Sequence, residues 1–330
     1  MNARQEWLAE RKTGLGGSDI AALLGMSQYK TPLALWMDKT GRADEEERDA
    51  AALERMHWGT VLEDVVARHY AAQRSCRVQR INQQLRHPQC AIAVANIDRA
   101  VLLDGTRARW DDAASRVLGA SHVLEVKTAH AMAQHGAEWG APGTDEVPQA
   151  YWLQCQWYLG ITGLPHADLA VLFGGQKFEV YTIAHDAPMF SDMLSEADQW
   201  WSKYVATDTP PDPTSEAEAR QLWKSHVAGR DKIVDRLVCS AVEDLADLNA
   251  QIKDLEGRVA EARNIILPAF GEAESISYMG RKLASWKANK ASSKTDWKGA
   301  CMAMEPEPEH IAQFTTTTDG ARVLRLNIKD

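Results

Sequence analysis

The chain has 330 residues, of which 45% are hydrophobic and 25% are charged. This composition is typical of a globular protein, and the length is sufficient for one large core with an additional module. No apolar run approaches the roughly 18 residues that a membrane-spanning helix needs, and residues 1–11 mix charged and apolar side chains instead of forming a signal peptide. We therefore expect a cytoplasmic protein with no membrane partner.

The net charge of −9 at pH 7 argues against a protein that coats DNA, because phosphate binding requires local positive charge. It does not exclude an enzyme with a basic channel. A candidate basic patch lies near the C-terminus, where a solvated face is an equally good interpretation: Arg281, Lys282, Lys287, Lys290, Lys294 and Lys298. The five cysteines and ten histidines show no zinc-site spacing, so we expect any metal to be a hard cation with oxygen ligands.

Helices and strands alternate in the first two thirds of the chain. Residues 31–70 carry apolar positions at three and four spacing, which predicts two or three helices. Strands rich in β-branched residues follow, and the last two of them are expected to be central: 78–85, 91–103 and 122–128. Beyond these we predict a helix, a hairpin around Gly174-Gly175 and a closing helix: 146–159, 167–183 and 188–205.

Three prolines within residues 207–213 predict a linker that ends a first domain of residues 1–206. Residues 214–270 then contain apolar positions that repeat over four heptads, which predicts a long amphipathic helix with a coiled-coil seam: Val238, Ala241, Leu245, Leu248, Ile252, Leu255, Val259, Ala262 and Ile266. The pattern leaves open whether the seam faces another subunit or folds back on the same chain. Pro268 and Gly271 are expected to end this helix. Residues 271–330 alternate in two stretches, 275–286 and 322–328, and predict a small β-rich module.

The central chemical signal is Asp98 on one predicted strand and Glu125-Val126-Lys127 on the next. Side chains alternate faces along a strand, so Glu125 and Lys127 point the same way and Val126 points into the opposite layer. Two carboxylates and a lysine on one face of a sheet are costly to bury unless they bind something. Magnesium fits this need, because the two carboxylates and the Val126 carbonyl offer hard oxygen ligands.

Lys127 has several roles open to it in such a site. It is placed to orient or deprotonate an attacking water, or to stabilise charge on the phosphorane, and we expect partial desolvation near metals to lower its pKa. The sequence does not choose between these roles. An Asp followed by an ExK pair also occurs by chance on exposed edge strands, so the pattern is weak by itself.

Three further residues raise the value of this pattern. Glu63 lies among apolar neighbours on a predicted helix, where its carboxylate could hold a metal-bound water, although an ordinary helix-surface glutamate is the alternative. Tyr151 and Gln154 are one helical turn apart and share a face of the helix that follows the ExK strand. From that face both could contact the scissile phosphate or the attacking water.

A glycine-rich segment near the N-terminus runs from Arg11 to Asp19 and reads RKTGLGGSD. Glycines before a serine N-cap at Ser18 would leave backbone amides exposed at a helix start, which is a phosphate site by geometry and dipole, and Arg11 could add a forked contact. The alternative is a capped helix after a turn. A dinucleotide-binding reading fails, because no strand precedes the glycines.

Taken together, these motifs resemble the lambda exonuclease family, also called YqaJ-like viral recombinases, within the PD-(D/E)xK nucleases. The resemblance covers roughly residues 4–205 and rests on RxxGxGGSD, WGxxLE, Asp98, ExK at 125–127 and YxxQ at 151–154. It implies an α/β fold with a restriction-endonuclease-like core, in which helices flank a central mixed β-sheet. The C-terminal coiled-coil helix and the small β module lie outside the compact fold of the best-known member.

The resemblance also implies site roles. Asp98, Glu125 and the Val126 carbonyl would bind Mg²⁺ or, in its place, Mn²⁺, and Glu63 would support a second ion. The water and the phosphate would be served by three residues: Lys127, Tyr151 and Gln154.

Arg11 and Ser18 match the arginine and serine that hold the 5′-phosphate of the recessed strand in the family. A third phosphate contact is a serine in the best-known member, in the sequence Ser-Pro-Asp-Gly around the metal aspartate. This chain has Asn96-Ile97-Asp98-Arg99 there, so the contact would pass to Asn96.

The family implies a homotrimeric ring that digests one strand of linear duplex DNA 5′ to 3′. The product would be a 3′ overhang for a single-strand annealing protein in phage or prophage recombination in a bacterial cell. A ring reconciles the net charge with DNA binding, since an acidic exterior can enclose a basic channel. The alternatives are a PD-(D/E)xK endonuclease that cuts circular DNA, and a non-catalytic DNA-binding scaffold that uses the coiled coil and the basic patch.

Overall fold

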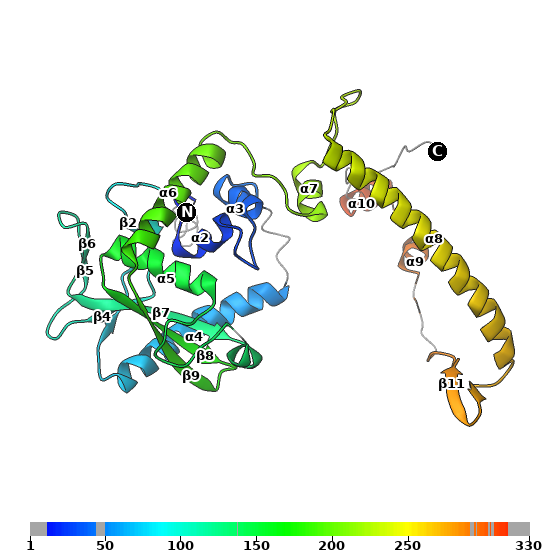
Figure 1. Cartoon of the computed structure of the whole chain (residues 1–330), viewed down its shortest axis with the longest axis horizontal. Coiled ribbons are helices and arrows are strands. Elements are labelled where there is room, and N and C mark those ends of the chain that lie inside the picture. Colours follow the sequence, from blue (N-terminus) through cyan, green and yellow to red (C-terminus); the bar gives the residue numbers. More distant parts are fainter. Residues whose placement is uncertain are drawn as a thin grey trace. The chain divides into compact units, whose positions relative to one another are not determined.

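The computed structural model describes residues 12–43, 50–136, 138–290, 294, 296–302, 304 and 307–315 (Figure 1). The chain divides into two compact units between Ala219 and Arg220. Arg11 and the strand predicted at 322–328 lie outside the described residues. Among the described residues, no helix is long and apolar enough to cross a membrane.

A five-stranded mixed sheet forms the centre of the first unit, with strand order β1-β4-β7-β8-β9. Its strands are β1 (Val78–Gln79), β4 (Arg99–Leu102), β7 (Ala120–Ala129), β8 (His166–Phe173) and β9 (Lys177–Ala184). β7 and β8 are parallel, and every other neighbouring pair in this sheet is antiparallel. The predicted central mixed sheet is therefore confirmed, and the two strands expected to be central correspond to β4 and β7.

Shorter strand pairs account for stretches that were predicted as longer strands. Of the predicted strand at 78–85, only the first two residues form β1. Leu85, its last residue, begins a different strand, β2 (Leu85–Arg86), which pairs with β3 (Val94–Ala95). The predicted strand at 91–103 divides into β3 and β4, which belong to different sheets and are separated by residues 96–98, where the chain forms no strand. β5 (Arg109–Asp111) and β6 (Arg116–Leu118) form a separate hairpin.

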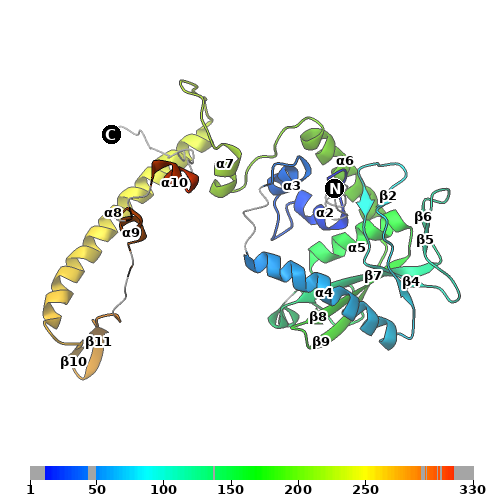
Figure 2. The same cartoon turned by 180° about the vertical axis from the view of Figure 1, so that it is seen from behind.

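Helices cover both faces of the sheet. α4 (Ala50–Gln73) crosses one face, where Val66 and Tyr70 pack with Leu124 and Val126 of β7 (Figures 1 and 2). Residues 125 and 127 of β7 have the opposite parity, and their face is covered by α5 (Gln149–Thr162) and α2 (Gly17–Leu23), which pack on each other. The sheet therefore separates the apolar cluster under α4 from the layer that holds Glu125 and Lys127.

The described part of the first unit also contains two further α-helices, a 3₁₀ helix, a π-helical turn and the hairpin of the central sheet. α3 (Pro32–Lys39) begins at Thr31, whose side chain caps the helix, and a 3₁₀ helix, η2 (Ala131–His135), follows β7. The predicted hairpin is β8 and β9, where Gly174 and Gly175 adopt positive φ angles of 58° and 71° that favour glycine. The predicted closing helix is α6 (Ala187–Trp200), continued by the π-helical turn η3 (Trp201–Val205).

The second unit is built on one long helix. α7 (Glu216–Leu222) crosses the boundary between the units, and α8 (Arg236–Phe270) begins at Asp235, whose side chain accepts a hydrogen bond from the Val238 amide at 3.0 Å. α8 ends at Phe270 with Gly271 as its C-cap, as the pair of Pro268 and Gly271 predicted, and Pro268 lies inside its last turn. A proline in the last turn disrupts only one backbone hydrogen bond, and Gly271 then ends the helix.

A hairpin and two short helices follow α8. β10 (Ser275–Tyr278) pairs with β11 (Arg281–Ser285), as the alternation at 275–286 predicted. Phe270 of α8 is buried and packs edge-on against Trp286 with ring centroids 5.8 Å apart. α9 (Trp297–Met302) and α10 (Pro308–Gln313) were not predicted by the β-rich assignment of the tail.

Candidate active site

The ExK motif lies in the middle of β7, where the strand alternation separates its three side chains. Glu125 is 2% exposed, and Lys127 Nζ donates a hydrogen bond to its Oε1 atom at 2.7 Å. Val126 belongs to the apolar cluster under α4 on the other face. The predicted geometry of this motif, with the charged pair on one face and the valine on the other, is present in the structure.

Asp98 approaches Glu125 because β4 and β7 part at this point. The antiparallel register ends at Arg99 and Leu124, so the next free amide of β7 is that of Val126. This amide donates a hydrogen bond to Asp98 Oδ2 at 2.9 Å. Asp98, which immediately precedes β4, therefore lies near Glu125 of the neighbouring strand β7.

The two carboxylates form a site that fits a divalent cation. Burial raises the pKa of Asp98 to about 8, and the nearby charge of Glu125 contributes to the rise. Glu125 Oε2 is buried and has no hydrogen-bond partner among the described residues. A buried carboxylate oxygen without a partner carries a desolvation cost that a hard cation would offset. The donor atoms present therefore fit Mg²⁺.

Lys127 is held as a cation by its neighbours. Burial lowers the pKa of Lys127, but the charge and hydrogen bond of Glu125 outweigh this effect and raise the pKa above its usual value. The sequence-based expectation of a lowered pKa is therefore wrong for the side chains alone, because it neglected the ion pair with Glu125. Lys127 Nζ also lies over the Tyr151 ring, 5.3 Å from its centroid.

α5 supplies a buried amide to the same carboxylate. Gln154 is 7% exposed, and its Nε2 atom lies 2.6 Å from Glu125 Oε1 and 3.0 Å from the Tyr158 hydroxyl oxygen. Tyr151 and Gln154 thus reach the same Glu125–Lys127 pair from one helix face, as their spacing predicted. Tyr158 was not identified from the sequence, although it lies one turn after Gln154 on that face.

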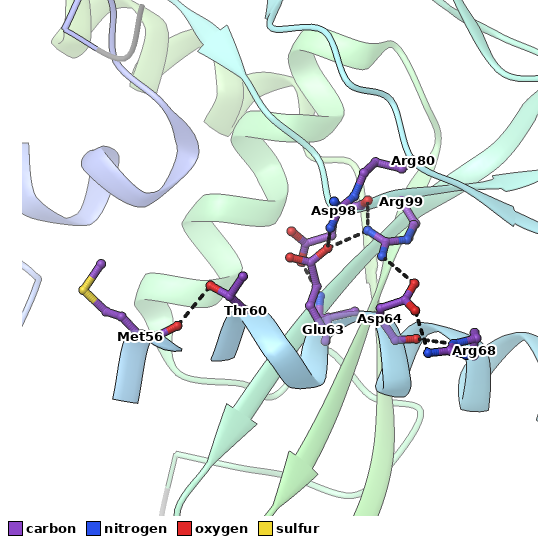
Figure 3. Close-up of polar contacts among 9 residues, drawn as sticks. Met56, Thr60, Glu63, Asp64, Arg68, Arg80, Asp98 and Arg99 are labelled. Carbon is purple, nitrogen blue, oxygen red and sulfur yellow. Dashed lines mark hydrogen bonds and ion pairs between the residues drawn. The ribbon is translucent and has the colours of Figure 1, made fainter. Parts of the chain in front are cut away.

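Glu63 contacts arginines in the structure (Figure 3). Its Oε1 atom accepts hydrogen bonds from Arg99 Nη1 and from Arg80 Nη2, both at 2.5 Å. Arg99 also donates to Asp64 Oδ1 at 3.2 Å and to the Asp98 carbonyl at 2.7 Å. Figure 3 shows the Glu63 side chain beside Asp98, so this network adjoins the carboxylate site. Arg99 was noted in the sequence only as a departure from the family pattern.

Ser18 and Asn96, two predicted phosphate contacts, line one cavity of about 130 Å³. The complete lining is Gly16, Gly17, Ser18, Asp19, Val94, Asn96 and Tyr158. Ser18 is exposed but is not the N-cap that the sequence suggested, because α2 begins at Gly17 with Gly16 as its cap. Asp19 takes the capping role instead, since its carboxylate accepts from the Gly16 amide at 3.0 Å and pairs with buried Lys39 at 2.6 Å.

Close packing explains two of the motif glycines. A Cβ atom on Gly17 would lie 2.7 Å from Tyr158 Cε1, and one on Gly14 would lie 2.5 Å from the Ile92 carbonyl oxygen. Gly17 therefore lets α2 approach the part of α5 that carries Gln154. A chain of hydrogen bonds therefore leads from the cavity to the carboxylate pair: Tyr158 lines the cavity, and Gln154 donates to both the Tyr158 hydroxyl and Glu125.

A second polar cluster lies on the α4 face of the sheet. His122, His166 and Asp168 offer ligand atoms within 4.8 Å of one another and could hold a metal ion. Asp168 already accepts from the Tyr70 hydroxyl at 2.6 Å and from the Thr182 hydroxyl at 2.8 Å. The cluster escaped the sequence analysis because its histidines come from neighbouring parallel strands, although the HxD spacing at residues 166–168 marks one shared face.

Comparison with known proteins gives a consistent result. A family described as the YqaJ-like viral recombinase domain matches residues 6–165. The uncharacterized protein YqaJ of Bacillus subtilis (strain 168) is 31% identical over 292 residues, which cover 86% of this chain and 83% of that protein.

Two solved structures are similar at lower identity. An alkaline exonuclease, LHK-Exo, from Laribacter hongkongensis has a TM-score of 0.44 and 16% identity, covering 62% of this chain and 93% of its own. A phage-related exonuclease from Haemophilus somnus 129PT has a TM-score of 0.41 and 11% identity, covering 59% of this chain and 96% of its own.

Proposed function

This chain belongs to the YqaJ-like viral recombinase family, and we propose that its first unit is a Mg²⁺-dependent deoxyribonuclease. The observation that carries the proposal is the pair of half-buried Asp98 and buried Glu125, in which Oε2 of Glu125 has no partner among the described residues. Lys127 beside this pair completes the set of groups that phosphodiester hydrolysis needs.

Asp98, Glu125 and the Val126 carbonyl would hold Mg²⁺ or Mn²⁺, which supplies Lewis acidity and a more acidic water. Glu63 would support a second ion while it shares its carboxylate with Arg80 and Arg99.

The protein side chains have separable roles. Lys127, which stays protonated beside Glu125, would orient the attacking water and stabilise charge on the phosphorane. Gln154 holds Glu125 through its amide, and the Tyr151 ring lies beside the Lys127 ammonium group. These roles favour Lys127 as a charged stabiliser over a free base.

We further propose that digestion proceeds 5′ to 3′ from a 5′-phosphorylated end of linear duplex DNA. The cavity beside Ser18 and Asn96 supports this polarity, because it offers a hydroxyl and an amide next to the carboxylate site. Arg11 would add a charged contact from outside the described residues. A homotrimeric ring and a single-strand annealing partner for the 3′ overhang complete the proposal.

Purified protein incubated with end-labelled duplexes tests the nuclease proposal. We expect digestion of a linear duplex with Mg²⁺, none with EDTA, and no cutting of closed circular DNA. Lys127→Ala and Glu125→Ala should abolish digestion, whereas Lys177→Ala, which alters an exposed lysine of the same sheet, should not. Full activity of either active-site variant would overturn the assignment, and cutting of the circle would support an endonuclease instead.

The polarity has its own experiment, with blunt duplexes that carry a 5′-phosphate or a 5′-hydroxyl. Loss of charge-assisted hydrogen bonds of about 1.5 to 3 kcal/mol each predicts a preference for the phosphate of on the order of ten-fold or more. The preference should shrink in Arg11→Ala, Ser18→Ala and Asn96→Ala and persist in Ser195→Ala, an exposed serine of α6. Equal rates on both ends, or degradation from the 3′ end, would refute the phosphate pocket but not the metal site.

A further inference from the structure

α8 carries an apolar stripe that the proposed nuclease chemistry does not use. Its large side chains are between 37% and 54% exposed: Val238, Leu245, Leu248, Ile252, Leu255, Val259 and Ile266. A groove along the same helix is lined by Ile252, Leu255 and Val259 among others. A 35-residue amphipathic helix gains most of its stability by packing such a face against a partner.

We propose that α8 pairs with α8 of a second copy of this chain in an antiparallel two-helix coiled coil. This inference does not depend on the proposed nuclease activity. The direction of pairing follows from the sizes and the charges of the residues along the seam.

The seam consists of two rows with unequal side chains. One row is large throughout: Val238, Leu245, Ile252, Val259 and Ile266. The other row is large only in its middle and ends in alanines: Ala241, Leu248, Leu255 and Ala262. In a coiled coil these rows take the a and d positions of the heptad.

A parallel pairing would match each row with itself. Ala241 would then face Ala241 of the second copy, and Ala262 would face its own counterpart, which leaves two layers underfilled. An antiparallel pairing instead layers one row on the other. With Ile252 beside Leu255 of the second copy, Ala241 faces Ile266 and Ala262 faces Leu245, so that each small residue meets a large one.

The residues that flank the seam favour the same direction. In a parallel pair, Arg258 at a g position would adjoin Arg263 at the following e position of the second copy, and this repulsion would occur twice by symmetry. In the antiparallel pair, Arg258 adjoins Gln251 and Arg263 adjoins Val242 of the second copy. No charges of like sign then flank the seam.

The pairing is isologous, with its two-fold axis between Lys253 and Asp254, and therefore joins two copies and closes. The heptad pattern of α8 therefore supports an association of two chains, and it is not evidence for the homotrimer. If the first unit forms a ring, the helices of one ring would pair with those of another.

Distance measurement on the full chain tests the direction. Cys239 is exposed on α8, so a spin label there reports the pairing after the other accessible cysteines, Cys76 and Cys301, are replaced by serine. Residue 239 lies opposite residue 268 of the second copy, which predicts about 44 Å between labels at 1.5 Å per residue. A parallel pair would give a distance of about one helix diameter, roughly 10 to 20 Å with the labels, and would overturn the proposal.

A matched pair of variants tests the surface itself. Ile252→Lys places a charge in the seam, and Ala250→Lys adds the same charge on the outer face of α8. We expect Ile252→Lys to halve the mass of the full chain in light scattering and to remove the 44 Å distance, with both retained in Ala250→Lys. An unchanged mass in Ile252→Lys, as expected if the seam is covered by another segment of the same chain or by an unrelated protein, would refute the pairing.

Discussion

Gln154 of α5 and Glu125 of β7 are joined by a hydrogen bond of 2.6 Å between the amide nitrogen and Oε1. Lys127 donates to the same oxygen, so the other carboxylate oxygen of Glu125 is left for a further ligand. The amide and the lysine together fix which oxygen of Glu125 faces the proposed metal site.

Replacement of Gln154 by alanine should therefore reduce the nuclease rate by on the order of ten-fold or more, because Glu125 loses a buried donor that orients it. Tyr158→Phe is the matched control. It removes only the weaker 3.0 Å partner of the same amide, and we expect a change of less than about three-fold. Single-turnover rates on a 5′-phosphorylated duplex measure both effects, and equal losses in the two variants would contradict the positioning role.

The stability of the metal-free protein should depend on the ionisation of Asp98. Its pKa is raised from an ordinary value of 3.8 to about 8, so the folded state binds a proton more tightly than the unfolded state. This contribution is fully present below about pH 4 and is lost as the pH rises toward 8. We expect the melting temperature in EDTA to fall over this window in wild type more steeply than in Asp98→Asn. Parallel pH profiles would contradict a raised pKa, and Mg²⁺ at pH 8.5 should stabilise wild type more than the variant.

Strand alternation was sufficient to predict the relation between Glu125 and Lys127, because two residues on one strand share a face whatever surrounds them. The approach of Asp98 followed from the expectation that its strand neighbours β7. The pair of Glu63 and Arg99 could not be predicted in this way, because it depends on how α4 lies across β4. Hydrophobic periodicity predicts that a helix packs, but it does not encode the axial position at which it packs.

The N-terminal motif shows a second limit of sequence reasoning. Glycines beside a serine and an aspartate are compatible with several caps, and the structure selects Asp19 because Lys39 of α3 neutralises it in the interior. The requirement for Gly17 depends on the contact with Tyr158, a residue far away in the sequence. Only the three-dimensional packing of α2 on α5 assigns these roles.

Gly17→Ala should test that packing. The new Cβ would lie 2.7 Å from Tyr158 Cε1 and 3.1 Å from the Gln154 carbonyl oxygen, so α2 must shift away from α5. We expect a loss of about 1 to 3 kcal/mol in the free energy of unfolding. In Gly16→Ala the nearest atom is Asp19 Oδ2 at 3.8 Å, so only the cost of alanine at the N-cap remains, which should be less than about 1 kcal/mol. Urea denaturation compares the two, and an equally stable Gly17→Ala would show that the helices are less tightly packed.

The polar cluster on the α4 face should contribute to stability without affecting catalysis. Tyr70→Phe removes the hydroxyl that donates to Asp168 at 2.6 Å and leaves a buried carboxylate partly unsatisfied. We expect a loss of about 1 to 3 kcal/mol in the free energy of unfolding, with unchanged nuclease activity under folded conditions. Tyr278→Phe, at a residue that is 64% exposed, is the control. A loss of activity in Tyr70→Phe at full folding would connect this cluster to the reaction.

Arg99 should have opposite effects on stability and on metal binding. Its side chain is 6% exposed and pairs with Glu63 and Asp64, so Arg99→Ala leaves carboxylates beside Asp98 without their main counter-charge. Glu63 keeps Arg80, and Asp64 is 57% exposed, so we expect a loss of about 1.5 to 3 kcal/mol in the free energy of unfolding. Arg68→Ala is the matched control, since that exposed arginine pairs with Asp64 on the same helix and should contribute at most about 1 kcal/mol.

The same substitution should strengthen Mg²⁺ binding. A guanidinium next to the carboxylate site repels a cation and engages Glu63, so its removal increases the negative charge available to the metal. Melting temperatures measured across a Mg²⁺ titration should show a lower total stability for Arg99→Ala but a larger stabilisation by the metal, with a midpoint at a lower Mg²⁺ concentration than in wild type. Arg68→Ala should follow the wild-type titration. A midpoint shifted to higher Mg²⁺ concentration in Arg99→Ala would mean that Arg99 holds Glu63 and Asp98 in the arrangement that the metal requires.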